Sequence, residues 1–190
     1  MTAPSRLIRR RGNGVGASAR PLKIVVTGPF SAGKTTLIKT ISEVAVVGTE
    51  RDVTDETSAV KHKTTVAMDF GRLTFSDGVS LFLFGTPGQR RFEMMWEILS
   101  EGMIGFIVLV HAAEPLSLEE AGHILQTFRR YADVPYVVGL THLDQTADDP
   151  DDIAAKVRIA LDLPPEVPVL PCDPRGRSDV KKLLLAVLLG

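Results

Sequence analysis

The sequence predicts an α/β fold with a mostly parallel sheet and helices on both faces, and two observations support this. Continuous apolar runs occur at 105–111 and 136–141, with helical patterns between them, and such runs are typical of strands buried on both faces. Two further strand-like runs, at 67–75 and 79–84, are separated by a short turn that contains Asp77-Gly78, which predicts one antiparallel pair. In sheets of this kind, ligands bind at the carboxyl ends of the strands.

The other predicted elements alternate strand and helix along the chain. Their boundaries follow from apolar periodicity and from residues that commonly start helices. They are a strand at 22–27, a helix from Thr35 to about Val47, a helix opened by a capping box at 117–120 and running to about Arg130, a helix from Asp149-Pro150 to about Leu161, a strand at 167–170 and a last helix capped by Ser178. The predicted sheet therefore has six strands.

Composition predicts one soluble domain, at 21–190, preceded by a flexible basic tail at 1–20. The chain has 190 residues, of which 44% are hydrophobic, and its formal net charge of -1 gives no overall attraction to nucleic acid. The tail holds five arginines and no acidic residue, and a solvated arm is favoured over contact with anionic lipid or an acidic partner. A single cysteine, Cys172, and no membrane-length apolar run predict a cytoplasmic protein.

A glycine-rich loop stands directly after the first predicted strand. Its sequence, GPFSAGKT at 28–35, matches the pattern GxxxxGK[ST] in full. In this pattern the backbone N–H groups curl around phosphate oxygens, Lys34 neutralises the β- and γ-phosphates, and the Thr35 hydroxyl binds Mg²⁺. The following helix directs its N-terminus at the anion. The sequence therefore predicts a P-loop NTPase fold that binds a nucleoside di- or triphosphate with Mg²⁺.

Three further stretches carry a resemblance to a known family. They are TTVAMDFG at 64–71, LFGTPGQRRF at 83–92 and THLD at 141–144. Together with the phosphate loop, they make residues 22–190 resemble the Ras-like small GTPases, and more closely the bacterial conservon-type GTP-binding proteins, relatives of the MglA group. The resemblance implies a nucleotide-dependent molecular switch in bacterial signalling that hydrolyses GTP slowly with Mg²⁺.

The resemblance also implies roles for single residues. Gln89 would orient the attacking water, the amide of Gly88 would sense the γ-phosphate, and Asp144 would accept two hydrogen bonds from guanine. Thr65, with Thr64 as second choice, would bind the metal. The full expected sets are Lys34 and Gln89 for catalysis; Gly28, Ser31, Ala32, Gly33, Lys34, Thr35, Thr36 and Gly88 for the phosphates; Thr141, His142, Asp144, Cys172 and Asp173 for the base; and Thr35 and Thr65 for Mg²⁺.

The sequence departs from that family at positions that carry its chemistry. Gly85 replaces an aspartate directed at the metal, and Phe30 stands where the tight space beside the γ-phosphate usually requires glycine. Thr141 and His142 replace the Asn and Lys of the base loop. Loss of an outer-shell carboxylate weakens a metal site by about 10 to 100-fold, so we expect looser Mg²⁺ coupling rather than none.

The residues after Gln89 leave two questions open. Arg90 or Arg91 could reach the γ-phosphate, but surface or partner-facing positions are favoured. The apolar residues from Phe92 to Trp96 either form a surface that depends on nucleotide state or pack against the domain.

Two other functions also remain open at this level. One is a nucleotide-binding scaffold with little or no hydrolysis, which Gly85 and Phe30 favour and Gln89 opposes. The other is an ATP-using P-loop phosphotransferase, which needs an arginine-bearing lid that the sequence does not show. The resemblance itself implies GTP or GDP as ligand, a Roadblock/LC7-type regulatory protein and a sensor-kinase-like protein as partners, and indirect membrane association through them. No nucleic-acid partner is expected.

Overall fold

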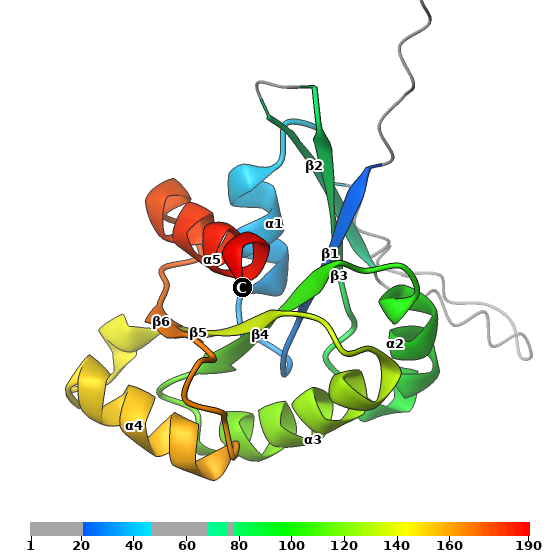
Figure 1. The fold of residues 1–190 in the computed structure, drawn as a ribbon. Helices are drawn as coiled ribbons and strands as arrows, with labels where there is room; N and C mark the ends of the chain where they lie inside the picture. The colour runs from blue at the N-terminus through cyan, green and yellow to red at the C-terminus, as the bar shows by residue number, and fades with distance from the viewer. Residues whose placement is uncertain (1–20, 47–67, 76–77) are drawn as a thin grey trace, which may run out of the picture.

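The computed structural model describes residues 21–46, 68–75 and 78–190. These form a six-stranded sheet with helices on both faces (Figure 1). The strand order is β2-β3-β1-β4-β5-β6, and every neighbouring pair is parallel except β2 and β3. The predicted fold class is confirmed, including its single antiparallel pair. The expected tail at 1–20 and the expected metal ligand Thr65 lie outside the described residues.

The strands form close to where apolar runs predicted them. Their bounds are β1 Leu22–Thr27, β2 Asp69–Thr74, β3 Ser80–Gly85, β4 Gly105–His111, β5 Tyr136–Thr141 and β6 Val169–Pro171. Strand β6 begins later than expected because the backbone N–H of Val167 donates to the carbonyl of Pro164 in a turn, and Pro168 has no N–H to donate.

Helices follow most strands. Their bounds are α1 Lys34–Ile41, α2 Glu93–Ser100, α3 Pro115–Tyr131, α4 Pro150–Ala160 and α5 Arg177–Leu189, with short 3₁₀ turns η1 at Arg90–Phe92 and η2 at Leu143–Gln145. Helix α1 is shorter than predicted because the chain becomes extended at Ser42, and the N–H of Glu43 then donates to the carbonyl of Arg72 on β2 (2.7 Å). Helix α4 has the predicted start, and the Asp149 carboxylate accepts from the N–H of Asp151 (2.8 Å).

Two predicted helix starts were wrong. Helix α3 begins at Pro115, whose fixed φ suits the first helical position, and Glu114 caps it in place of Ser117. The Ser117 hydroxyl instead accepts from the N–H of His111 at the end of β4 (2.9 Å). Helix α5 begins one residue before Ser178, with Gly176 at its N-cap position.

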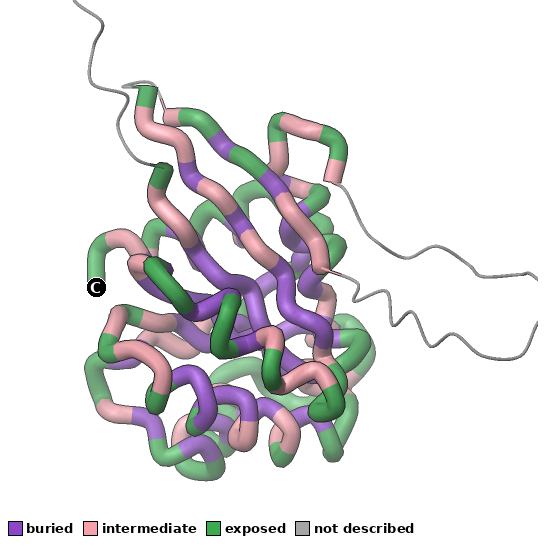
Figure 2. Tube along the Cα trace, turned by 90° about the vertical axis from the view of Figure 1, so that its right-hand side faces the viewer, coloured by how far each residue is buried: buried purple, intermediate pink, exposed green. Residues whose placement is uncertain are grey.

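The core consists of two apolar clusters, one on each face of the sheet. Alternating residues of β1 divide between them: Ile24 and Val26 pack with α1 and α5, whereas Val25 packs with α2, α3 and α4. Figure 2 shows the buried central strands between more exposed helices. Within the described residues, no helix is both long and apolar enough to cross a membrane.

The topology brings the chemistry-bearing loops to one edge of the sheet. The parallel strands β1, β3, β4, β5 and β6 all end at this edge. Strand β2 runs the opposite way, so its first residue, Asp69, lies opposite Gly85, the last residue of β3. The edge therefore receives the start of β2 as well as the five loops that follow the parallel strands.

Candidate functional site

A pocket of about 810 Å³ lies at this edge, within the size range of nucleotide and cofactor sites. It is lined by the phosphate loop and the start of α1, by the loop from Thr86 to Phe92, and by the loops that follow β5 and β6. The predicted site residues that line it are Ser31, Gly33, Lys34, Thr35, Thr36, Gly88, Gln89, His142, Asp144, Cys172 and Asp173. The structure thus brings together most of the residues that the sequence singled out.

Three of the predicted residues, Gly28, Ala32 and Thr141, are buried and do not line the pocket. Gly28 has φ of 141°, and a Cβ there would lie 2.4 Å from the carbonyl oxygen of Leu109 on β4, so no other residue fits. The buried hydroxyl of Thr141 donates to the carbonyl of Ala32 (3.0 Å). Thr141 therefore joins the end of β5 to the phosphate loop, a role that the sequence did not predict.

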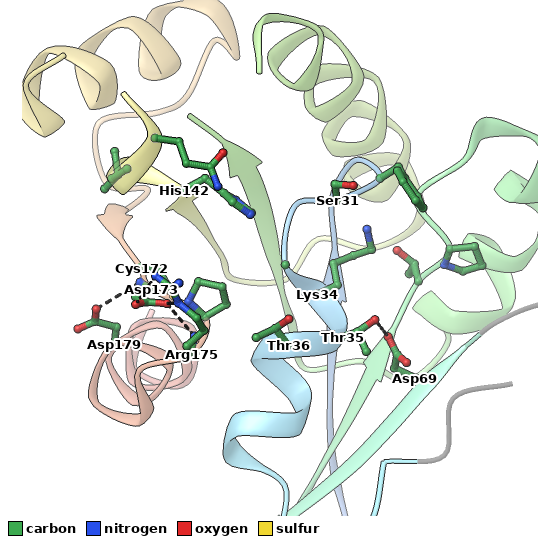
Figure 3. A pocket seen from close by; sticks show the side chains of 18 of the residues that line it. Ser31, Lys34, Thr35, Thr36, Asp69, His142, Cys172, Asp173, Arg175 and Asp179 are labelled. Carbon is green, nitrogen blue, oxygen red and sulfur yellow. Dashed lines mark hydrogen bonds and ion pairs between the residues drawn. The ribbon is translucent and has the colours of Figure 1, made fainter. Parts of the chain in front are cut away.

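Lys34 is the buried cation of the pocket. Its side chain projects from the start of α1 (Figure 3), and its Nζ donates to the carbonyls of Gly28 (2.8 Å) and Pro29 (2.6 Å). Burial lowers the pKa of Lys34 to about 8, against the opposing pull of the Asp69 and Glu120 carboxylates. A phosphate oxygen at this position would compete with the two carbonyls and would favour the charged ammonium.

A carboxylate lies beside the Thr35 hydroxyl, which is expected to bind Mg²⁺. It does not come from position 85, where the sequence has glycine. The Thr35 hydroxyl donates to Asp69 Oδ2 at 2.5 Å, as Figure 3 shows. A Cβ added to Gly85 would lie 3.1 Å from the same oxygen and 2.9 Å from Cδ1 of Ile38. Glycine at 85 therefore leaves room for the Asp69 side chain. The neighbouring antiparallel strand β2 therefore places a carboxylate beside Thr35 where β3 has none.

The Thr35–Asp69 pair fits Mg²⁺. This ion prefers oxygen ligands and is commonly held by one or two carboxylates together with substrate phosphates. The described residues contain no cluster of three or more His, Cys, Asp or Glu that would hold a metal without such phosphates. Sequence reasoning missed Asp69, but counting outward from the Asp77-Gly78 turn pairs it with Gly85.

The loop that follows β3 closes against the phosphate loop. A Cβ on Gly88 would lie 2.6 Å from the backbone nitrogen of Phe30 and 2.9 Å from Nζ of Lys34. Gly88 is therefore placed beside the lysine, and Gln89 follows it on the pocket wall. The Phe30 side chain is 69% exposed, so its ring is not packed into the loop that Gly88 approaches.

Trp96 connects this loop to α2. The tryptophan is fully buried against the domain, and its Nε1 donates to the carbonyl of Pro87 (3.0 Å). Of the two roles that the sequence left open for this segment, the structure shows packing for Trp96. Met94, by contrast, is 74% exposed.

We predict that nucleotide binding changes the fluorescence of Trp96, the chain's only tryptophan. We expect a phosphate group beside Gly88 to displace the loop whose Pro87 carbonyl accepts the hydrogen bond from Trp96. This displacement would change the surroundings of the indole ring. The measurement is an emission spectrum with a nucleoside diphosphate and with a non-hydrolysable nucleoside triphosphate analogue, each with Mg²⁺. Spectra that are identical to that of the free protein would show that the loop does not respond.

The opposite end of the pocket carries a charged cluster built on Arg175. Its guanidinium donates to both carboxylate oxygens of Asp173 (2.8 and 3.0 Å) and to Oδ2 of Asp144 (3.1 Å). These hydrogen bonds hold the pKa of Asp173 below its usual value. Figure 3 shows Arg175 and Asp173 grouped on the side away from Lys34. The sequence analysis did not single out Arg175.

Two other side chains at this end have shifted pKa values. Burial and the neighbouring His111 lower the pKa of His142, whose ring stacks on that of His111 with centroids 3.7 Å apart. Burial raises the pKa of the Cys172 thiol to about 12, with Asp179 and Asp173 adding to the effect. Cys172 therefore has no thiolate at neutral pH with which to act as a nucleophile.

Comparison with known proteins identifies a relative and a family. The chain is 34% identical over 100 residues to an uncharacterized protein of the archaeon Methanocaldococcus jannaschii, a match that covers 52% of this chain and 56% of the relative. The chain thus spans about half the length of that relative. A family model described as "Conserved hypothetical ATP binding protein" matches residues 26–188, nearly the whole domain.

These findings correct the resemblance to Ras-like and conservon-type GTPases, which was wrong. The family match is to ATP-binding proteins. The surroundings of the residues expected to bind guanine also differ from those expected. Asp144 accepts a hydrogen bond from Arg175, and Thr141 is buried and donates to the phosphate loop. The signalling partners that were expected rest on that resemblance alone. The chain is a nucleotide-binding protein and belongs to the family of conserved ATP-binding proteins that this model describes.

Proposed function

We propose that this chain is a Mg²⁺-dependent P-loop ATPase that binds ATP and hydrolyses its terminal phosphoanhydride bond, slowly when alone. One observation carries the proposal: the buried Lys34, the Thr35–Asp69 pair and Gln89 line the same pocket, and Gly88 lies directly beside Lys34. Phosphoryl transfer depends mainly on positioning and charge stabilisation, and this arrangement provides both.

Each residue has a defined task in this reaction. Thr35 and Asp69 would hold Mg²⁺, which neutralises charge on the β- and γ-phosphates when bound. Lys34 donates to the phosphate oxygens in place of the loop carbonyls, and Gln89 orients a water for attack. The water oxygen forms a bond to the γ-phosphorus, the bond to the β–γ bridging oxygen breaks, and ADP leaves. The water protons pass to the released phosphate and to solvent.

The family match and the charged cluster both favour adenine as the base. Guanine binding of the kind expected from the sequence uses an N1–H and a 2-amino group together on one carboxylate. In this structure Oδ2 of Asp144 already accepts from Arg175. The exocyclic amino group of adenine needs only one carboxylate oxygen, so Asp144 can serve it while Arg175 stays in place.

We predict that Arg175→Ala shifts base preference toward guanine. The substitution frees Oδ2 of Asp144 from its bond to Arg175, and we expect the ratio of ATP to GTP affinity to fall by about tenfold, the effect of one hydrogen bond to a charged group. The measurement is competition for a fluorescent ADP analogue. Arg177→Ala is the matched control, because Arg177 is exposed and does not line the pocket. An unchanged ratio in Arg175→Ala would refute this role.

Hydrolysis is tested by single-turnover phosphate release from ATP bound to the wild-type chain, with and without Mg²⁺. We expect slow release that requires Mg²⁺ and that Gln89→Leu slows further. Tight ATP binding with no release would favour a nucleotide-binding scaffold instead. Release only when an acceptor molecule is added would favour a phosphotransferase.

A further inference from the structure

We propose that Arg91 is a catalytic residue of this chain, the arginine that contacts the terminal phosphate and stabilises the charge that develops there during hydrolysis. This inference rests on the proposed function. It does not follow from the sequence, which placed Arg90 and Arg91 side by side and gave no reason to separate them. The structure does separate them.

The two arginines point in different directions. Both belong to the 3₁₀ turn η1, in which successive residues are rotated by about a third of a turn. Arg90 reaches away from the pocket to the carboxylate of Glu119 on α3 (3.9 Å), and both side chains are largely exposed. Arg91 lines the pocket, together with Lys34, Gly88 and Gln89. The turn thus sends one arginine toward α3 and the other toward the site.

Arg91 is positioned by the turn itself. The N–H of Phe92 donates to the carbonyl of Gln89 (3.0 Å), which closes the turn directly after the residue that orients water. The guanidinium of Arg91 lies 4.7 Å from the centroid of the Phe92 ring, which also lines the pocket. Packing on an aromatic ring restricts the long side chain and leaves the N–H groups at the guanidinium edge free for phosphate oxygens.

Charge supports the same assignment. Among the described residues, no carboxylate forms an ion pair with Arg91, whereas Arg90 pairs with one carboxylate and Arg175 with two. At the phosphate end of the pocket, Lys34 is the other lysine or arginine that lines the wall, and Asp69 adds negative charge. The triphosphate therefore brings more negative charge than Lys34 and Mg²⁺ offset, and Arg91 is the cation available to reduce the excess.

The test compares Arg91→Ala with the matched control Arg90→Ala and with Arg91→Lys. We measure single-turnover ATP hydrolysis, the affinity for ADP, and the trapping of ADP by aluminium fluoride, which mimics the transferring phosphoryl group. Loss of a catalytic arginine is worth about 10³-fold or more in rate, so we expect at least a 100-fold slower reaction and loss of trapping in Arg91→Ala. The ADP affinity stays within about twofold, because Arg91 acts on the terminal phosphate. Arg91→Lys recovers only part of the rate, because a lysine lacks the planar fork.

The outcomes separate this inference from the proposed function. If the wild-type chain hydrolyses ATP and Arg91→Ala does so equally fast, Arg91 is not catalytic and the ATPase proposal stands. Equal losses in Arg90→Ala and Arg91→Ala would also overturn the inference, because they would indicate a general effect on the turn. If the wild-type chain neither hydrolyses ATP nor traps ADP with aluminium fluoride, both proposals are refuted.

Discussion

Replacing Lys34 by alanine is expected to abolish measurable ATP binding. The buried ammonium of Lys34 donates to two loop carbonyls in the free protein and would donate to the triphosphate instead when ATP binds. No other residue of the loop supplies a charged donor. Removing one partner of a buried, charge-assisted contact costs several kcal/mol, which corresponds to about a 100-fold loss of affinity or more. The measurement is titration calorimetry with ATP and Mg²⁺.

The control is Lys39→Ala, because Lys39 lies on the same helix and is exposed. It should bind ATP as the wild type does. Binding by Lys34→Ala within about threefold of the wild type would contradict the role of the phosphate loop.

The wild type should also show a pH dependence that identifies Lys34. Burial lowers its pKa in the free protein to about 8, and bound phosphate favours the charged form and so raises that pKa. At pH values between the pKa of the free protein and that of the complex, ATP binding takes up a proton. ATP affinity is therefore at its maximum below pH 8 and falls as pH rises above it. The expected slope approaches about tenfold per pH unit. Affinity that stays constant from pH 7 to 9.5 would show that Lys34 does not titrate in this range.

Replacing Asp69 by glycine is expected to weaken Mg²⁺ binding and so to raise the Mg²⁺ concentration that hydrolysis needs by about 10 to 100-fold. Asp69 is the carboxylate that contacts the Thr35 hydroxyl (2.5 Å), and metal sites typically lose about 10 to 100-fold in affinity when such a group is removed. The measurement is the Mg²⁺ concentration that gives half-maximal hydrolysis. Arg72→Ala is the control, because Arg72 is an exposed residue of the same strand that does not line the pocket.

Exchanging the residues at the paired positions 69 and 85 tests whether the carboxylate can act from either strand. Gly85→Asp alone places a Cβ 3.0 Å from that of Asp69 and a second carboxylate beside the first, so we expect a lower melting temperature and no gain in Mg²⁺ affinity. Asp69→Gly combined with Gly85→Asp moves the carboxylate from β2 to the paired position on β3 and should recover Mg²⁺ affinity in part. A double variant as defective as Asp69→Gly would show that the two positions are not equivalent.

Most of the fold was predictable because its signals are local. The strands at 22–27, 105–111 and 136–141 have the predicted bounds, since continuous apolar runs between glycine-rich or polar loops leave little ambiguity. The caps of α3 and α5 were not predictable from local pattern alone. The Ser117 hydroxyl was taken by the backbone of β4, a contact that exists only once the helix packs beside that strand.

The candidate site was likewise predictable only where its signals are local in the sequence. The phosphate loop was predictable because each of its fixed positions has a task at a fixed spacing. Asp69 and Arg175 were missed because their partners, Thr35 and Asp144, are 34 and 31 residues away in sequence. The expected base site left out Arg175 for the same reason, although it included Asp144 and Asp173, which this arginine joins.

The central claim is that this pocket binds ATP with Mg²⁺ and turns it over. The most direct measurement is single-turnover release of phosphate from ATP by the nucleotide-free protein, with GTP as competitor and with Mg²⁺ present or chelated. We predict slow release from ATP that requires Mg²⁺ and that GTP inhibits only at a large excess. ATP that neither binds nor is hydrolysed, or GTP that is preferred by orders of magnitude, would contradict it.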